Sequence, residues 1–515
     1  MTPGPDLNGS GVLPGRPRAG VGLHFSSLPG GYGIGDIGDQ ALAFVDHMAE
    51  MRLHVWQFLP VGPTAYGDSP YQPLSAFAGN EMLIGLEPLV RDGLLHTTEL
   101  GDLASLPEHA VDFARLIPAK QALLKLAARR FATAADGALR EGYDAFLHGP
   151  HGQWLDDYAL FRILKSMHGE RPWPEWETPC ARRDRSALEK AASDHQADIE
   201  SIKVLQFLFE RQWRRLRQYA GERGVRLFGD IPIYIALDSV DAWSHPELLL
   251  IDRDGRPSRV AGVPPDYFSE DGQLWGNPLY DWDYHASTGY RWWVWRVQDA
   301  ADKFDMVRVD HFRGFEAYWS VPFGASTARE GCWERGPGDA LFEALERSLD
   351  RLPIVAEDLG VITEEVVALR LRHNIPGMEV LQFALGDEDF DLQDIDEYSI
   401  CYTGTHDNDT TVGWFRGTSD DTRTRQEIEA MRRNALRLTG GTPATIHEDM
   451  IRLAFASRAR VASAPMQDYL GLGSEARINI PGTTLNNWRW RLTAGQLSGA
   501  VRERIADMVD ESSRG

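Results

Sequence analysis

Three carboxylic acids stand where buried strands of this chain are expected to end. Asp310 closes the apolar run Val-Arg-Val-Asp-His, Glu357 closes Ile-Val-Ala-Glu-Asp, and Asp407 follows Thr-Gly-Thr-His. Carboxyl groups can serve as nucleophile, as general acid or base, or as stabiliser of a developing positive charge. Side chains alternate between the two faces of a strand, so Arg308 shares a face with Asp310 and keeps that carboxylate ionised, as a nucleophile requires.

Helix capping is the alternative explanation for each acid, because Asp is common where a strand leads into a helix. Three such acids, two of them beside His or Arg, make this explanation less attractive for the set. Their sequence neighbours Asp358 and Asp409 fit helix caps better. The three acids therefore predict a catalytic centre at one end of a sheet.

The elements that would position these acids alternate along the chain. Short runs rich in Val, Ile, Leu and aromatic residues are typical of strands buried in a parallel sheet. Helical stretches lie between them, for example at 40–51 and 363–373. This alternation predicts an α/β fold, most simply a (β/α)8 TIM barrel with helical insertion subdomains, whose active site lies at the C-terminal ends of the strands. The predicted strands are 21–25, 53–61, 225–235, 306–310, 353–357, 378–383 and 400–405.

Two long segments interrupt the alternation. Residues 90–220 are predicted to form a mostly helical insertion, with one long helix ending near Gly224. Residues 238–290, dense in Pro, Gly, Asp and aromatic residues, are predicted to be lid and insertion loops. Residues 1–20, rich in Pro and Gly, are expected to be a flexible lead. The remaining 21–515 are expected to form the catalytic barrel around the two insertions.

Composition excludes several classes of function. With 53 Lys and Arg against 76 Asp and Glu, the net charge is −23, whereas nucleic acids and anionic membranes require a basic surface. The three cysteines, Cys180, Cys332 and Cys401, are far apart and fit a reducing compartment. No apolar run approaches the length of a membrane span, and residues 1–20 contain no apolar segment of the signal-peptide type. We expect a cytoplasmic protein without nucleic-acid or membrane partners.

Two motif matches fail on their details. Residues 33–38 fit a dinucleotide fingerprint, but Asp36 would set a carboxylate beside the pyrophosphate, and the next strand does not end in an acid for the ribose. The acidic stretch 387–391 resembles a calcium loop that lacks its Gly and its Glu. The sequence therefore predicts neither an organic cofactor nor a metal.

Aromatic residues near the expected strand ends indicate the kind of substrate. Flat apolar rings next to acids and amides suit sugars, which have apolar C–H faces and hydroxyl edges. Trp275, in a polar segment with Gly and Asn, is the strongest of these candidates. The aromatic residues in question are Trp56, Tyr66, Tyr71, Tyr267, Phe268, Trp275, Tyr280 and Trp282.

As a set, the motifs resemble those of the 4-α-glucanotransferases (amylomaltases, or disproportionating enzymes) of glycoside hydrolase family 77, in the α-amylase clan. The resemblance runs from about residue 20 to about 495. It covers the three acid motifs and the segments 27–30, 33–36, 56–60, 69–72, 75–80, 229–234, 264–268, 276–280, 467–468, 471–473 and 487–491.

The resemblance implies a role for each matching residue. Asp310 corresponds to the nucleophile, Glu357 to the acid/base and Asp407 to the stabiliser of the transition state. Tyr71, Arg308 and His406 would lie beside the donor sugar, and Tyr267, Gln273 and Trp275 would close over the acceptor. The implied substrate-binding residues are Tyr71, Asp230, Tyr267, Gln273, Trp275, Arg308, His311 and His406.

Two positions depart from the family pattern. Ile480 stands where a Thr is expected, and Asn486 stands where a Gly is expected. Both lie away from the three acids in the sequence. They therefore bear on outer sugar contacts or on local backbone shape and not on the chemistry.

The function implied is retaining transfer of α-1,4-glucan segments to the 4-hydroxyl of an acceptor glucan or glucose, through a covalent glucosyl-enzyme. Retention would require the carboxyl groups of Asp310 and Glu357 to lie ~5–5.5 Å apart. No cofactor is implied, the partners are maltooligosaccharides, and a monomer or homodimer is expected. A glucan hydrolase using the same acids and a non-catalytic glucan-binding protein remain as alternatives.

Overall fold

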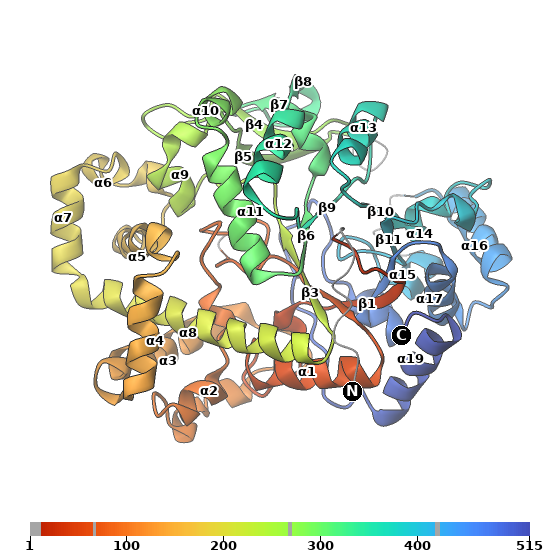
Figure 1. The fold of residues 1–515 in the computed structure, drawn as a ribbon, viewed down its shortest axis with the longest axis horizontal. Helices are drawn as coiled ribbons and strands as arrows, with labels where there is room; N and C mark the ends of the chain where they lie inside the picture. Colours follow the sequence, from red (N-terminus) through yellow and green to blue (C-terminus); the bar gives the residue numbers. More distant parts are fainter. Residues whose placement is uncertain (1–11, 65–67, 266–269, 418–422) are drawn as a thin grey trace.

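The computed structural model describes residues 12–64, 68–265, 270–417 and 423–515. Its main sheet has eight parallel strands in the order β10-β11-β12-β1-β2-β3-β6-β9. The last strand of this order returns to the first, because the Ala356 N–H of β9 donates to the Pro376 carbonyl just before β10 (2.8 Å). The predicted (β/α)8 barrel is thus confirmed (Figure 1). Its strands are β1 (Arg18–Gly22), β2 (Val55–Gln57), β3 (Arg226–Ile231), β6 (Met306–Val309), β9 (Ile354–Ala356), β10 (Gly377–Val380), β11 (Ser399–Tyr402) and β12 (Val461–Pro465).

Helices surround the barrel, and strand alternation separates two apolar clusters. Side chains pointing into the barrel, such as Val55, Phe228 and Ile400, form one cluster, whereas outward residues pack with the helices in the main core. Within the described ranges, no helix combines the length and apolar character needed to cross a membrane. The helices outside the two insertions are α1 (Asp39–Glu50), α11 (Arg291–Lys303), α12 (Asp339–Ser348), α13 (Glu364–Arg372), α14 (Leu381–Ala384), α15 (Thr411–Arg416), α16 (Arg425–Thr439), α17 (Ile446–Ala456), α18 (Met466–Tyr469) and α19 (Gly499–Glu511).

The barrel begins earlier than the sequence predicted. Strand β1 starts at Arg18, so residues 18–20 are not part of a flexible lead. Val12 and Leu13 are buried with the inward-facing strand residues, and Arg226 at the start of β3 donates to the Val12 carbonyl (3.3 Å). Apolar contact at the N-terminal ends of the strands thus orders part of the Pro- and Gly-rich segment. Residues 1–11 of the predicted lead lie outside the described residues.

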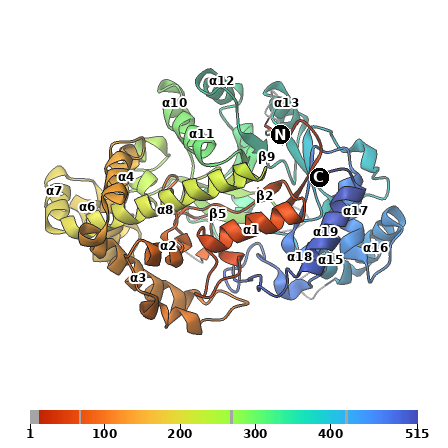
Figure 2. The same cartoon turned by 60° about the horizontal axis from the view of Figure 1, so that its bottom comes forward.

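The segment between β2 and β3 contains seven of the described α-helices, which Figure 1 places at one side of the barrel. The long helix α8 (Gln196–Glu222) packs against α1, α3 (Phe113–Ala134) and α5 (Gly152–Met167), and Figure 2 shows it running beside α1. Gly224 follows it with φ 70°, a left-handed conformation that glycine adopts without strain. The helices are α2 (Leu86–Arg91), α3 (Phe113–Ala134), α4 (Gly137–Leu147), α5 (Gly152–Met167), α6 (Thr178–Ala181), α7 (Arg185–Asp194) and α8 (Gln196–Glu222).

The predicted loops at 238–290 contain regular structure. Short helices α9 (Val240–Ser244) and α10 (Trp282–Ser287) flank the strands β4 (Arg259–Val263) and β5 (Gln273–Pro278). These strands pair antiparallel and join β7 (Ala317–Pro322) and β8 (Cys332–Arg335) in a second sheet of order β5-β4-β7-β8. The expectation of lid loops was wrong for the residues in these strands, because β4 pairs with β5 within the segment and with β7 outside it.

Candidate active site

The loops that follow β6 and β9 hold Asp310 and Glu357 next to each other. The Glu357 N–H donates to the Val309 carbonyl (3.1 Å), which fixes the end of β9 against the end of β6. The Glu357 carboxylate in turn accepts the His311 N–H at Oε2 (2.7 Å). Backbone hydrogen bonds therefore connect the residue after Asp310 directly to the Glu357 carboxyl group.

Arg308 joins Asp310 to a second buried carboxyl group. Its Nη2 donates to Asp310 Oδ1 (2.8 Å) and its Nη1 to Asp230 Oδ2 (2.7 Å), and Tyr71 Oη donates to the same Asp230 oxygen (2.9 Å). Burial opposes the positive charge of Arg308, but the two carboxylates outweigh burial and raise its pKa well above the usual value. The ion pair predicted from strand alternation is present, and Arg308 remains a permanent cation beside Asp310.

Asp407 lies in the loop after β11 and is held by residues that the sequence did not single out. Asn479 Nδ2 donates to Asp407 Oδ1 (2.6 Å), and Arg477 donates to the Asp407 carbonyl (2.7 Å). His406 Nε2 lies 3.5 Å from Asp407 Oδ2, and its ring stacks on Tyr71 with centroids 5.2 Å apart. The structure thus brings Tyr71, His406 and Asp407 together as expected, and adds Arg477 and Asn479.

These two residues carried a weak signal in the sequence. Their segment follows β12, whose residues Val-Ala-Ser-Ala-Pro are too small to read as a strand. Because the eighth strand was not predicted, the sequence did not indicate that residues 477–479 would lie above the barrel. The available indication was the Arg and Asn of an Arg-Ile-Asn segment that follows residues 471–473, which belong to the family resemblance.

The environment raises the pKa of two carboxyl groups at the site. Burial raises the pKa of Glu357 to about 7, with Arg308 opposing the shift and Asp310 adding to it. Burial also raises the pKa of Asp230 to about 7, against the attraction of Arg308. A carboxyl group that keeps its proton near neutral pH can act as a general acid, and Glu357 combines this property with its position beside Asp310.

Trp275 and His311 meet on the other side of the acids. Their rings are perpendicular, with centroids 4.7 Å apart, and Trp275 Nε1 donates to Gln273 Oε1 (3.2 Å). His311 takes φ 54°, a left-handed conformation that is uncommon for a residue other than glycine. Trp275 lies on strand β5 and not in a loop, since Leu274 pairs with Gly262 and Gln273 with Val263. Tyr267 and Phe268 lie outside the described residues.

The capping alternative does not hold for the three acids. The N-cap positions of the helical segments after β6, β9 and β11 are His311, Thr363 and Thr410. Asp358 and Asp409 were also expected as caps, and this expectation was wrong. Asp358 accepts the Met378 N–H (2.7 Å), and Asp409 accepts the Ser474 hydroxyl (2.6 Å), because both side chains reach neighbouring segments of the fold.

Two of the aromatic candidates belong to the core. Trp56 has no exposed surface and packs between Phe25 and Phe44, because alternation on β2 turns it toward the helices. Tyr280 is 1% exposed and donates to the Ile233 carbonyl (2.9 Å). Tyr66 lies outside the described residues. Tyr71 and Trp275 are thus the aromatic candidates that the structure places beside the acids.

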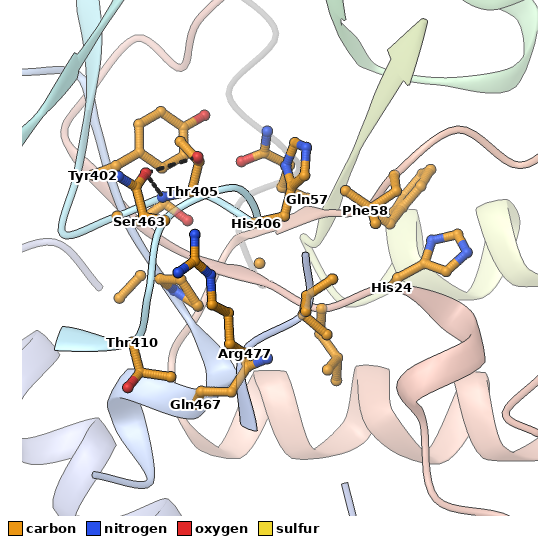
Figure 3. A pocket seen from close by; sticks show the side chains of 18 of the residues that line it. His24, Gln57, Phe58, Tyr402, Thr405, His406, Thr410, Ser463, Gln467 and Arg477 are labelled. Carbon is orange, nitrogen blue, oxygen red and sulfur yellow. Dashed lines mark hydrogen bonds between the residues drawn. The ribbon is translucent and has the colours of Figure 1, made fainter. Parts of the chain in front are cut away.

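A pocket opens between the ends of β1, β2, β11 and β12 (Figure 3). Its surface is mostly apolar and carries several hydrogen-bonding groups, among them Gln57, Tyr402, Ser463 and Arg477. Arg308 and His406 also line it, so the pocket adjoins the acids. A mostly apolar pocket with several donors and acceptors suits a sugar, which has apolar C–H faces and hydroxyl edges.

Of the two positions that depart from the family pattern, Asn486 is explained by its backbone conformation. Asn486 takes φ 64°, in the left-handed region where glycine is favoured and where Asn is the next most tolerated residue. At Ile480, the backbone N–H donates to Asn487 Oδ1 (3.0 Å), a bond that does not depend on its side chain. Both positions therefore keep the local backbone without the expected residues.

The geometry supports nucleophilic and acid–base chemistry at a single centre. Asp310, which is paired with Arg308, lies beside Glu357, whose pKa is raised. Asp407 is held nearby by the side-chain amide of Asn479. Within the described ranges, no group of three or more His, Cys, Asp or Glu side chains is arranged to hold a metal ion.

Comparison with known proteins gives consistent matches over nearly the whole chain. Residues 23–497 match the family model described as 4-alpha-glucanotransferase. The 4-alpha-glucanotransferase of Thermus thermophilus is 44% identical over 506 residues, covering 97% of this chain and 99% of that protein. That of Synechocystis is 44% identical over 486 residues, covering 93% of this chain and 94% of that protein. Among solved structures, the amylomaltase from Streptococcus agalactiae in complex with acarbose superposes with a TM-score of 0.91 at 35% identity, covering 97% of this chain and all of that one.

Proposed function

The chain belongs to the 4-alpha-glucanotransferase family of glycoside hydrolase family 77 and acts by transfer between α-1,4-glucans, and we propose that Asp310, Glu357 and Asp407 carry out this transfer with retention. Glu357 gives its proton to the glycosidic oxygen as Asp310 attacks the anomeric carbon and the bond to the leaving glucan breaks. Glu357 then takes the proton of the acceptor 4-hydroxyl, whose oxygen displaces Asp310. We also propose that the carboxyl groups of Asp310 and Glu357 lie ~5–5.5 Å apart.

The observation that carries the proposal is the difference between the two neighbouring acids. Asp310 pairs with a buried arginine (2.8 Å), whereas burial raises the pKa of Glu357 to about 7. A carboxyl group paired with a cation, next to an acid that keeps its proton, is the arrangement that a retaining mechanism needs at the start.

Asp407 is proposed to bind the 2- and 3-hydroxyls of the donor sugar and to favour the flattened oxocarbenium-like ring. Asn479 donates to one of its oxygens (2.6 Å) and so orients the carboxylate. Tyr71, Asp230, Arg308 and His406 would surround the same sugar. Burial lowers the pKa of His406, so its neutral ring is available for hydrogen bonds to hydroxyl groups.

The acceptor is proposed to enter on the side of Trp275. Gln273 and His311, which contact Trp275, would share this role, and so would Tyr267. We also propose that residues 90–220 and 238–290 act as insertions of a single catalytic domain. The proposed state is a cytoplasmic monomer or homodimer.

Incubation with maltotriose tests the proposed function. Transfer yields glucose together with oligomers longer than the substrate, because one molecule serves as donor and another as acceptor. A glucan hydrolase with the same acids would yield only shorter products. A non-catalytic glucan-binding protein would leave maltotriose unchanged, so the product ladder separates all three possibilities.

The raised pKa of Glu357 sets a pH dependence. The general acid must be protonated, so we expect kcat/KM with natural donors to hold below pH 7 and to fall as pH rises through about 7, by about tenfold per unit. Asp230 titrates in the same range. A donor with a good leaving group needs no acid in the first step and should show no such fall. A flat profile to pH 9 with natural donors would contradict the assignment of Glu357.

We expect Trp275→Ala to raise the ratio of hydrolysis to transfer. A glucosyl-enzyme meets a large excess of water, so transfer requires that the acceptor be bound and water be kept out. Trp275 packs on His311 beside both acids and is only partly buried, so its loss opens this side. The measurement compares glucose release with longer oligomers from maltotriose. An unchanged ratio at any overall rate would show that another part of the site excludes water.

A further inference from the structure

The chain leaves β3 in a buried segment whose carbonyl groups need partners outside the sheet. Residues 232–236 are buried and form neither helix nor strand. The first of them, Pro232, has no N–H with which to extend the sheet. Just before it, the Ile231 carbonyl accepts the N–H of Asp310 (3.0 Å). The position of this segment therefore bears directly on the residue proposed as the nucleophile.

Arg296, on the helix α11 that packs against β6, holds this segment by two of its carbonyl groups (Figure 1). Its Nη2 donates to the Pro232 carbonyl (2.5 Å) and its Nη1 to the Ile233 carbonyl (2.9 Å). Tyr280 Oη donates to the same Ile233 carbonyl (2.9 Å) and accepts from Arg296 Nη1 (3.3 Å). The guanidinium thus joins two successive peptide groups in a fixed fork geometry, which a lysine ammonium does not provide.

Burial makes an arginine unfavourable at this position unless its hydrogen bonds matter. Arg296 is only 3% exposed and forms no ion pair with a carboxylate of the described residues. Its Nε is buried without a hydrogen-bond partner. The rings of Trp293 and Trp292 compensate in part, since their centroids lie 4.9 and 5.3 Å from its guanidinium carbon. An apolar side chain would pack here without an unpaired buried charge, so the two carbonyl contacts are what the arginine adds.

The end of β3 has a second connection to Asp310. Asp230, the residue before Ile231, lies opposite Arg308 in the strand register. Its carboxylate accepts from Arg308 (2.7 Å), which also donates to Asp310 (2.8 Å). A shift of this strand end would thus reach Asp310 by two routes, through its own N–H and through its arginine partner.

We propose that Arg296 is a positioning residue for Asp310, because it fixes the strand end from which the nucleophile is held. As a buried residue, it acts through the backbone and does not touch the sugar. The inference rests on the proposed function, in which Asp310 attacks the anomeric carbon. Displacing a reacting group by about 1 Å can lower a rate about 10²-fold. Attack by Asp310 is common to all donors, so natural and activated donors should lose rate alike, unlike in Glu357→Gln.

Rapid-mixing kinetics of Arg296→Met test this inference. The rate of intermediate formation is measured at saturating donor, as release of a good leaving group, well below the Tm of each variant. We expect this rate to fall about 10- to 100-fold, while Kd for the donor stays within about threefold of the wild type. The kcat with maltotriose should fall by a similar factor. Arg296→Lys, which keeps the charge but not the fork, should lose less, about three- to tenfold.

Arg514→Met is the matched control. Arg514 is 2% exposed and donates to the carbonyls of Phe455, Ser457 and Ala459, ahead of the N-terminal end of β12. It should lower Tm as Arg296→Met does, yet leave the rate of intermediate formation within about twofold of the wild type, because these carbonyls lie at the opposite end of the barrel from the acids.

Three results would overturn the inference. The first is an equal loss of rate in Arg296→Met and Arg514→Met, or no loss in either. The second is a loss confined to natural donors, which would place the effect on the general acid. The third is a changed ratio of hydrolysis to transfer with an unchanged first step. If Arg296→Met does not fold, Arg296→Lys is judged by the same results. Full activity of Asp310→Asn would instead contradict the proposed function itself.

Discussion

Asp310→Asn should abolish turnover of maltotriose while leaving the fold intact. An amide cannot form the glycosyl ester, so we expect kcat to fall about 10⁵-fold. This corresponds to an increase of about 7 kcal/mol in the activation free energy. Arg308 would lose the negative charge that now accepts at 2.8 Å but keep Asp230 at 2.7 Å, so no buried cation is left without a counter-ion. Kinetics with maltotriose and a thermal melt measure the two effects separately.

Asp389→Asn is the control for the loss of one negative charge, because Asp389 lies in the exposed acidic stretch far from Arg308 in the sequence. It should leave both activity and melting temperature unchanged. Activity of Asp310→Asn within tenfold of the wild type would rule out Asp310 as the nucleophile. A large drop in melting temperature would mean that the lost activity reports on folding.

Glu357→Gln should lose the reaction with natural donors but keep part of the first step with donors that have good leaving groups. Protonation of a poor leaving group by a general acid contributes about 10²–10⁴-fold, and a good leaving group needs little of it. The expected result is therefore a drop of that size with maltotriose, together with build-up of the glycosyl-enzyme from activated donors. Mass spectrometry of the intact protein detects the intermediate.

A second effect follows from the hydrogen bonds at Glu357. Its Oε2 accepts the His311 N–H (2.7 Å) and its Oε1 the Leu359 N–H (3.0 Å). A glutamine can satisfy only one of these donors, because its NH₂ group would face the other N–H. Formation of the intermediate should thus be slowed modestly even with the best leaving group. Equal damage with activated and natural donors would indicate that another residue is the acid.

Local pattern was enough to predict much of the barrel and its acids. The pairing of Arg308 with Asp310 follows from strand alternation, which is a property of adjacent residues. The long helix α8 and its end before Gly224 follow from helical periodicity and from the conformational freedom of glycine. Strand β12 was missed because its small residues lack the bulk that marks a buried strand.

Contacts between distant segments could not be predicted in the same way. Trp56 and Trp275 are the same residue type near strand ends, yet one is core and the other lies beside His311. Which way each ring points depends on the elements packed around it. The antiparallel pairing of β4 with β7 likewise made part of the expected loops a sheet, since β7 lies outside that segment of the chain.

The sequence by itself determined the fold class, the three acids at the strand ends and the resemblance to a glucan-transferring family. These features depend on residue type and on short spacings, and both can be read directly from the sequence. Only the tertiary structure decided which groups set the pKa and the orientation of those acids. Asp230 shares Arg308 with Asp310, Asn479 orients Asp407, and the His311 N–H donates to Glu357. Burial and hydrogen bonds from distant segments set the pKa and orientation of a side chain, and both exist only once the barrel has closed.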